Sequence, residues 1–90
     1  MKSVTTRAFR RRLRALPPDI RGQARTAYRR WVDNPNHPSL RFKRVSDGLP
    51  ALYSVRITRD FRAVGELRDE TIYWQFIGNH DDYMRYLGVL

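Results

Sequence analysis

The sequence predicts an α+β domain in which two N-terminal helices form a hairpin on one face of an antiparallel sheet of about four strands, followed by a short C-terminal helix. Three observations predict it. Apolar residues recur at helical spacing over residues 9–32, alternate at strand spacing in segments between residues 40 and 77, and return to helical spacing after residue 80. Ninety residues with 41% hydrophobic content suffice for one compact core, so we expect a single domain spanning residues 1–90.

The first predicted helix begins after Thr5 or Thr6, either of which is a suitable N-cap. Phe9, Leu13 and Leu16 form its apolar stripe. The other faces carry arginines, which either solvate the surface or contact RNA or a protein partner: Arg7, Arg10, Arg11, Arg12 and Arg14. We take Arg10, Arg11 and Arg14 as candidate RNA-binding residues.

The second predicted helix begins at Pro17-Pro18, because proline ends one helix but fits the first turn of the next. It stops near Asp33-Asn34-Pro35, and His37 in the following loop is most simply a polar loop residue. Its stripe should face the core: Ile20, Ala24, Ala27, Tyr28, Trp31 and Val32. The short link between the helices predicts the antiparallel hairpin.

Strand-like alternation marks four segments, over residues 40–45, 53–57, 61–66 and 72–77. In the first, Leu40 and Phe42 should point to the helices, and Arg41, Lys43 and Val45 to the open face. In the last, Trp74 and Phe76 should share one side, and both, with Trp31, are assigned to the core. Gly78-Asn79 should end that strand, and His80 should open a helix docked through its apolar residues: Tyr83, Tyr86, Leu87 and Leu90.

The two central strands, joined by a turn at Thr58 to Asp60, each carry an arginine on the side away from the apolar residues. If the strands are antiparallel, Arg56 and Arg62 stand near each other on the open face. Two like charges held close are unfavourable unless an anion lies between them, and phosphate is the anion that guanidinium groups fit best. The alternative is that both arginines only solvate the sheet.

The formal charge is +9 and is unevenly distributed: residues 1–45 hold thirteen Lys and Arg against two acids, and residues 46–90 hold five against seven. Such a basic half attracts polyanions, with nucleic acid as the first candidate and an acidic protein as the second. The absence of cysteine excludes disulfides and thiolate metal sites, and two unclustered histidines predict neither a metal nor a cofactor. With no apolar run of about 20 residues and no signal peptide, we expect a cytoplasmic protein without a membrane span.

Cleaving RNA without a metal needs a base for the 2′-hydroxyl, cations for the charge at phosphorus and an acid for the leaving 5′-oxygen. His80 can serve as acid or base, and Tyr83 can stack on a base or donate to phosphate. Lys43 can act as a base only if its pKa is depressed. Arg56 and Arg62 can only stabilise charge and position the substrate.

Several segments together resemble the RelE/ParE superfamily of bacterial toxins: Leu40-x-Phe42-Lys43-x-Val45, Tyr53-Ser54-Val55-Arg56-Ile57, Phe61-Arg62-Ala63-Val64-Gly65, and Ile72-Tyr73-Trp74-x-Phe76-Ile77-Gly78-x-His80-Asp81-Asp82-Tyr83. The resemblance implies two N-terminal helices on an antiparallel sheet. It also implies a toxin that either cleaves mRNA in the ribosomal A site or poisons DNA gyrase, and a cognate antitoxin that covers the active face.

Matched position by position, Arg56 and Arg62 correspond to strand arginines that contact phosphate in the ribonuclease branch. His80 and Tyr83 correspond to its acid/base and stacking positions, and Lys43 to a basic residue of the first strand. Two features depart from the pattern: no acid stands between Asp33 and Asp47, and two aspartates separate His80 from Tyr83.

We therefore expect a metal-independent endoribonuclease, an mRNA interferase that arrests growth, with the antitoxin and mRNA on the ribosome as partners. Arg41 and Arg44 join the helix arginines as candidate RNA-binding residues. The alternatives are a gyrase inhibitor without nuclease activity and a non-catalytic nucleic-acid-binding domain.

Overall fold

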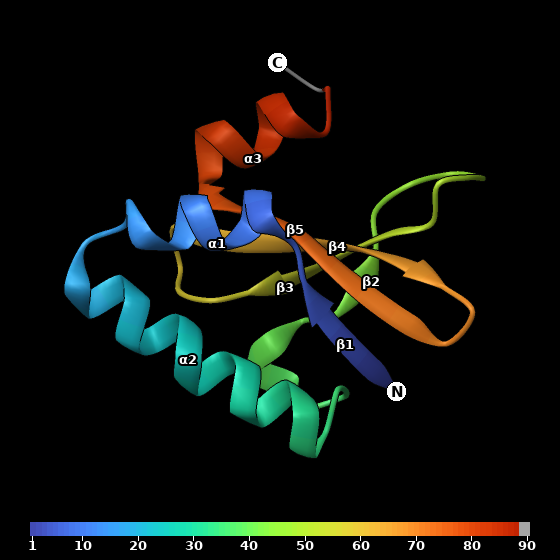
Figure 1. Cartoon of the computed structure of the whole chain (residues 1–90), viewed down its shortest axis with the longest axis horizontal. Helices are drawn as coiled ribbons and strands as arrows, with labels where there is room; N and C mark the ends of the chain where they lie inside the picture. Colours follow the sequence, from blue (N-terminus) through green and yellow to red (C-terminus); the bar gives the residue numbers. More distant parts are fainter. Residues whose placement is uncertain (89–90) are drawn as a thin grey trace.

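The computed structural model describes residues 1–88, which form one five-stranded sheet with helices on both of its faces (Figure 1). The elements in chain order are β1 (Lys2–Thr5), α1 (Arg7–Arg14), α2 (Pro18–Asp33), the 3-10 turn η1 (Pro38–Leu40), β2 (Lys43–Arg44), β3 (Leu52–Arg56), β4 (Phe61–Arg68), β5 (Thr71–Asn79) and α3 (His80–Tyr86). The predicted α+β class, with two N-terminal helices and a short C-terminal one, is confirmed.

The sheet has the strand order β1-β5-β4-β3-β2. The pairs β2–β3, β3–β4 and β4–β5 are antiparallel, as predicted, but β1 pairs in parallel with β5 and makes the sheet mixed. The prediction of about four strands misses β1 because its four residues, Lys-Ser-Val-Thr, include a single large apolar side chain. A parallel partner far along the chain leaves no local sequence signal.

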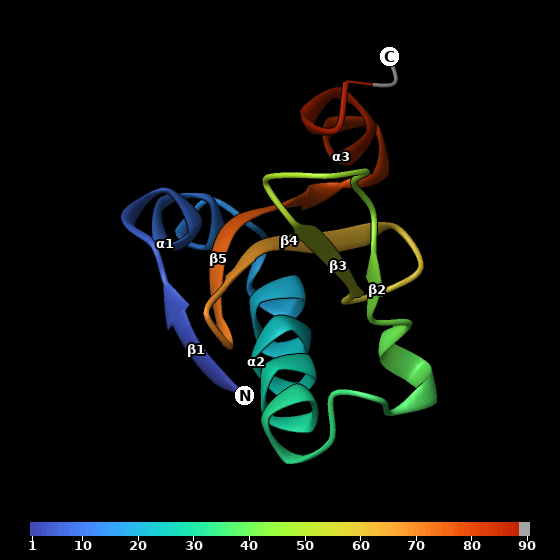
Figure 2. The ribbon, with the colours of Figure 1, turned by 90° about the vertical axis from the view of Figure 1, so that its right-hand side faces the viewer.

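The two faces of the sheet are covered by different helices. Figure 2 shows α2 below the central strands and α3 above them. Thr6 is the N-cap of α1 and its hydroxyl also donates to the carbonyl of Trp74, which ties α1 to β5. Phe9, Leu13 and Leu16 pack against the main core as predicted.

Trp31 of α2 is at the centre of the main core, in edge-to-face contact with Phe42 and Trp74 at ring-centroid distances of 5.7 and 5.3 Å. Ala24 and Ala27 are buried beside it. The predicted stripe of α2 is too wide, however, because Tyr28 is 41% exposed and Val32 is 59% exposed. A line of small residues ending in one large ring is enough to seat the helix on the sheet.

A register shift opposite Val64 and Gly65 corrects the predicted arrangement of β5. It inserts Gln75 as an extra residue, so Trp74 faces α2 while Phe76 faces α3 and packs with Val64 and Tyr83. Both aromatic rings are buried, as predicted, but in two separate clusters. The strand also continues through Gly78 and Asn79, which were expected to end it.

The predicted strand over residues 40–45 is mostly wrong. Leu40 ends η1, Arg41 adopts a left-handed conformation with φ 48°, and only two residues form β2. Leu40 and Phe42 still pack on the core as expected. His37 is a loop residue whose Nδ1 accepts a hydrogen bond from the Ser39 amide.

The C-terminal helix docks through Tyr83 and Leu87 on the small cluster around Phe76, and through Tyr86, whose ring stacks on Phe76. Leu90, the fourth residue assigned to this contact, lies outside the described residues. Within residues 1–88 no helix is long and apolar enough to cross a membrane.

Candidate nucleic-acid interface

A row of arginines crosses the end of the central strands on the face away from α2. Arg56 of β3 lies directly opposite Arg62 of β4, and Arg62 lies opposite Gly78 of β5. Directly opposed residues of antiparallel strands point to the same face, so the two guanidinium groups share one surface, as the alternation predicts. Gly78 has no side chain to come between Arg62 and the start of α3.

The Arg62 side chain is half-buried and anchored. Its Nη1 donates to the carbonyls of Thr58 at 2.8 Å, Arg59 at 3.2 Å and Phe61 at 3.2 Å, all in or beside the β3–β4 turn. Burial, with the nearby charges of Arg56 and Arg41, lowers the pKa of Arg62 below its usual value, while Tyr83 and Asp60 act in the opposite direction. An arginine titrates so far above neutrality that the group stays charged, and it is held in a fixed position.

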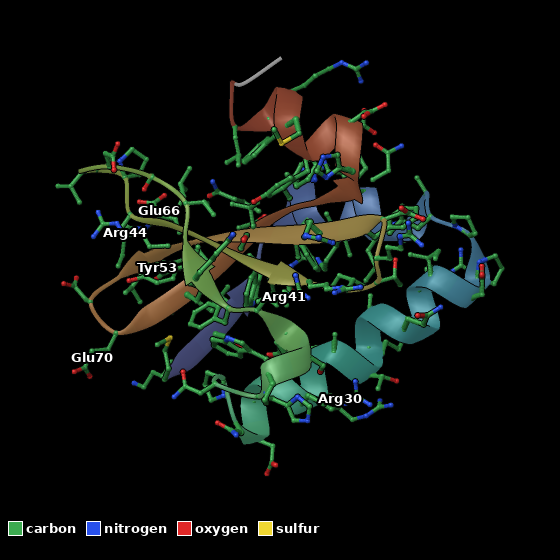
Figure 3. All side chains as sticks on the ribbon, turned by 180° about the vertical axis from the view of Figure 1, so that it is seen from behind. Arg30, Arg41, Arg44, Tyr53, Glu66 and Glu70 are labelled. Atoms are coloured by element: carbon green, nitrogen blue, oxygen red, sulfur yellow. The ribbon has the colours of Figure 1, made fainter. Side chains whose placement is uncertain are left out.

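Arg41 and Lys43 extend this positive surface toward β2. Arg41 follows η1 and lies close enough to lower the pKa of Arg62; Figure 3 shows it beside η1. Lys43 is exposed opposite Ser54, which precedes Arg56 by two residues and so shares its face. We call Arg41, Lys43, Arg56 and Arg62 the cationic row.

The other candidate RNA-binding arginines do not join the cationic row. Arg44 pairs with Tyr53 on the opposite face of the sheet, and its guanidinium donates to the carbonyls of Ser46 and Gly48, which stabilises the β2–β3 loop. Arg10, Arg11 and Arg14 are exposed on α1. Arg10 additionally donates to the carbonyl of Thr5, so part of its donor capacity is used within the fold.

His80 and Tyr83 follow β5 on the first turn of α3. Asn79 is the helix cap and accepts a hydrogen bond from the Asp82 amide, and the next residue, His80, is exposed. Tyr83 is only 7% exposed, since its ring packs with Val64 and Phe76. That burial leaves little ring surface for stacking on a base. Tyr83 packs on Val64, which is two residues from Arg62 on the same face of β4, so Tyr83 lies near the cationic row.

A hollow of 430 Å³ brings His80 beside the β3–β4 turn, with Arg59, Asp60, Asn79 and Asp81 as its other walls. The same turn supplies the carbonyls that hold Arg62, so His80 and the guanidinium of Arg62 both lie next to the β3–β4 turn. Sequence reasoning missed Arg59 because turn residues carry no phase that assigns them to a face. Its position in the turn between two arginines of known phase was the available signal.

The arrangement combines fixed positive charge, a titratable ring and a tyrosine near the row, which are the groups that phosphodiester chemistry without a metal needs. Within residues 1–88 no three His, Cys, Asp or Glu side chains are grouped as a metal site requires. What this surface offers is a set of positive charges for an anion such as phosphate, with a histidine at its rim.

Comparison with known proteins identifies the family. Residues 18–85 match the model of the ParE-like toxin domain. No curated protein sequence matches the chain.

Solved structures share the fold, and three of them illustrate it. The RelB-RelE antitoxin-toxin complex from Methanococcus jannaschii matches with a TM-score of 0.71 and 18% identity over 92% of this chain and 96% of that chain. The toxin-antitoxin complex RelBE2 from Mycobacterium tuberculosis matches with a TM-score of 0.67 and 22% identity over 88% and 96%. YafQ from E. coli strain BL21(DE3) matches with a TM-score of 0.72 and 8% identity over 91% and 96%.

Proposed function

Because the chain belongs to the ParE-like toxin domain family, we propose that it is the toxin of a toxin–antitoxin pair and that it cleaves mRNA on the ribosome without a metal ion. The observation that carries the proposal is the cationic row, with Arg56 and Arg62 directly opposed and His80 at the neighbouring rim. Opposed like charges favour binding of an anion between them, and RNA offers a phosphate for every nucleotide.

In the proposed reaction the 2′-hydroxyl of the substrate loses a proton and attacks the adjacent phosphorus, and the bond to the 5′-oxygen breaks. The products are a 2′,3′-cyclic phosphate and a free 5′-hydroxyl. Arg56 and Arg62 stabilise the additional negative charge that develops on the phosphate oxygens, and the anchored Arg62 does so without reorganising. His80 or Lys43 takes or returns the proton, and the Tyr83 hydroxyl orients the phosphate.

An antitoxin is the proposed protein partner. The structures from Methanococcus jannaschii and Mycobacterium tuberculosis are complexes of a toxin-like chain with an antitoxin. A basic surface such as this one favours an acidic segment that covers the cationic row and neutralises it.

Expression of the chain alone, with mapping of the 5′ ends of cellular mRNA, tests the proposal. We expect growth arrest and new 5′ ends inside translated reading frames. Arg62→Ala and His80→Ala should relieve the arrest and remove the cuts while antitoxin binding persists. Undiminished toxicity in both variants contradicts the site, and arrest with intact mRNA contradicts the activity.

Inhibition of DNA gyrase is the second candidate, and the burial of the Tyr83 ring favours it, because a buried ring removes one of the base contacts expected of a ribonuclease. Such an inhibitor would damage DNA and block replication with mRNA intact. A third possibility, a non-catalytic nucleic-acid-binding domain, predicts no arrest at all.

A further inference from the structure

A hollow of 570 Å³ lies between α2, η1 and the end of β3, outside the cationic row but touching it at Arg56. Its volume is within the range of about 300–1,000 Å³ that is typical of small-molecule sites. The walls come from three elements: Gln23, Thr26, Ala27 and Arg30 of α2, Ser39 and Leu40 of η1, and Arg56, Ile57, Thr58 and Arg59 at the end of β3. Figure 3 shows Arg30 on α2, beside η1.

The charged walls of the hollow are all arginines: Arg30, Arg56 and Arg59. The ion pairs recorded within residues 1–88 join Arg68 to Glu66 and Arg85 to Asp82, so no carboxylate neutralises these three. Their guanidinium groups also donate no hydrogen bond to another described residue, in contrast to Arg62 and Arg44. Unpaired arginines at positions 30 and 59 on this concave surface, with Arg56 at the edge that it shares with the cationic row, form a site for an anion.

The floor of the hollow is apolar, formed by the half-buried Ile57 over the buried Ala27 and Leu40. Gln23 is exposed, and within residues 1–88 its side chain makes no hydrogen bond. It can therefore donate a hydrogen bond to a ligand or accept one from it. An apolar floor beside donor-rich walls fits a ligand that joins a planar, weakly polar group to a phosphate. A nucleotide has this composition, and inorganic phosphate alone would leave the floor unused.

We propose that this hollow is a subsite for one nucleotide of a single-stranded RNA, with its phosphate held by Arg30 and Arg59 and its base on the apolar floor. The inference rests on the proposed function, because Arg56 belongs to both the hollow and the cationic row. An RNA strand gripped at Arg56 and Arg62 then continues around the end of β3 toward α2, and the subsite fixes the position of a nucleotide next to the one that is cut.

The test measures binding of a six-nucleotide RNA of mixed sequence with 2′-O-methyl groups, which cannot be cut because its nucleophile is blocked. The chain and its variants, made by cell-free synthesis, are titrated by fluorescence anisotropy at one salt concentration. Arg30→Gln should raise Kd about tenfold, the loss expected for one phosphate contact. Arg25→Gln removes the same charge from the same helix outside the hollow and should change Kd less than twofold. Equal effects of the two variants would overturn the subsite, since they would reflect net charge alone.

A second titration separates a nucleotide from a bare anion. UMP should shift the backbone amide resonances of Gln23 and Ser39, and inorganic phosphate should need at least a tenfold higher concentration for the same shift. Equal concentrations for both ligands, or shifts elsewhere, overturn the nucleotide subsite. Neither assay involves cleavage, so the two proposals can fail separately. If the RNA and UMP bind as expected but expression of the chain leaves mRNA intact, the ribonuclease proposal is refuted and the subsite stands.

Discussion

Arg56 and Arg62 lie directly opposite each other on β3 and β4, but only Arg62 is anchored to the fold. Its Nη1 donates to the Thr58 carbonyl at 2.8 Å and to two further turn carbonyls, whereas the Arg56 side chain makes no hydrogen bond within residues 1–88. The same residue type therefore has two roles on one surface: Arg62 stabilises the turn and presents a fixed charge, and Arg56 is available to a ligand.

The first prediction separates these roles by stability. Arg62→Gln should lower the free energy of unfolding by about 1–3 kcal/mol, because the turn carbonyls lose a charged donor. Arg56→Gln should change it by less than about 0.5 kcal/mol, since it removes an unpaired charge beside a like one. Urea denaturation of both variants measures the difference, while both should lose mRNA cleavage. Equal destabilisation would show that Arg56 is also structural.

The second prediction concerns His80. Because Asn79 caps α3, His80→Asn should leave the fold intact and lower the cleavage rate of translated mRNA by about 10²–10⁴-fold, the usual contribution of general acid–base catalysis. The limb of the pH–rate profile that belongs to the imidazole should vanish with it. His37→Asn is the matched control, since His37 lies in the loop before η1 and asparagine can also cap that turn. A full rate in His80→Asn would remove His80 from the mechanism.

The third prediction separates the role of the Tyr83 ring in packing from the role of its hydroxyl in orienting phosphate. Tyr83→Phe keeps the packing against Val64 and Phe76 and should leave the melting temperature nearly unchanged, but it should slow cleavage if the hydroxyl orients phosphate. Tyr83→Ala should cost about 2–5 kcal/mol, because it opens a cavity under α3. Thermal denaturation and the cleavage assay together decide; an unaffected rate in Tyr83→Phe means that the residue serves packing alone.

The part of the site that could be predicted is the part set by local periodicity. Alternation placed Arg56 and Arg62 on one face, and the short turn between them fixed their pairing. Proline and helical spacing likewise predicted α2 to within a residue at each end. These features depend on neighbours in the sequence, so the sequence contains their signal.

The rest depends on contacts between distant segments. The extra residue Gln75 in β5 reverses the phase of the strand, so Phe76 supports Tyr83 under α3 instead of packing on α2 beside Trp74. A bulge of this kind arises from pairing with β4 and leaves no periodic mark. Similarly, the left-handed Arg41 interrupts the predicted first strand, of which only two residues remain as β2.

The fourth prediction tests the packing of the main core at Gly65, where β4 pairs with β5. A Cβ at this position would lie 2.8 Å from Cγ1 of Ile72 and 2.9 Å from Cε3 of Trp74, both of which are side chains of the buried core. Gly65→Ala should therefore lower the free energy of unfolding by about 1–3 kcal/mol, the usual cost of overpacking. Gly22→Ala is the control with the opposite sign: nothing lies within 4 Å of its added methyl, and alanine in the interior of α2 should stabilise the chain by about 0.5–1 kcal/mol. Urea denaturation of the two variants measures both changes. Tolerance of alanine at position 65 would mean that Ile72 and Trp74 can shift away from β4, and that this part of the core is not closely packed.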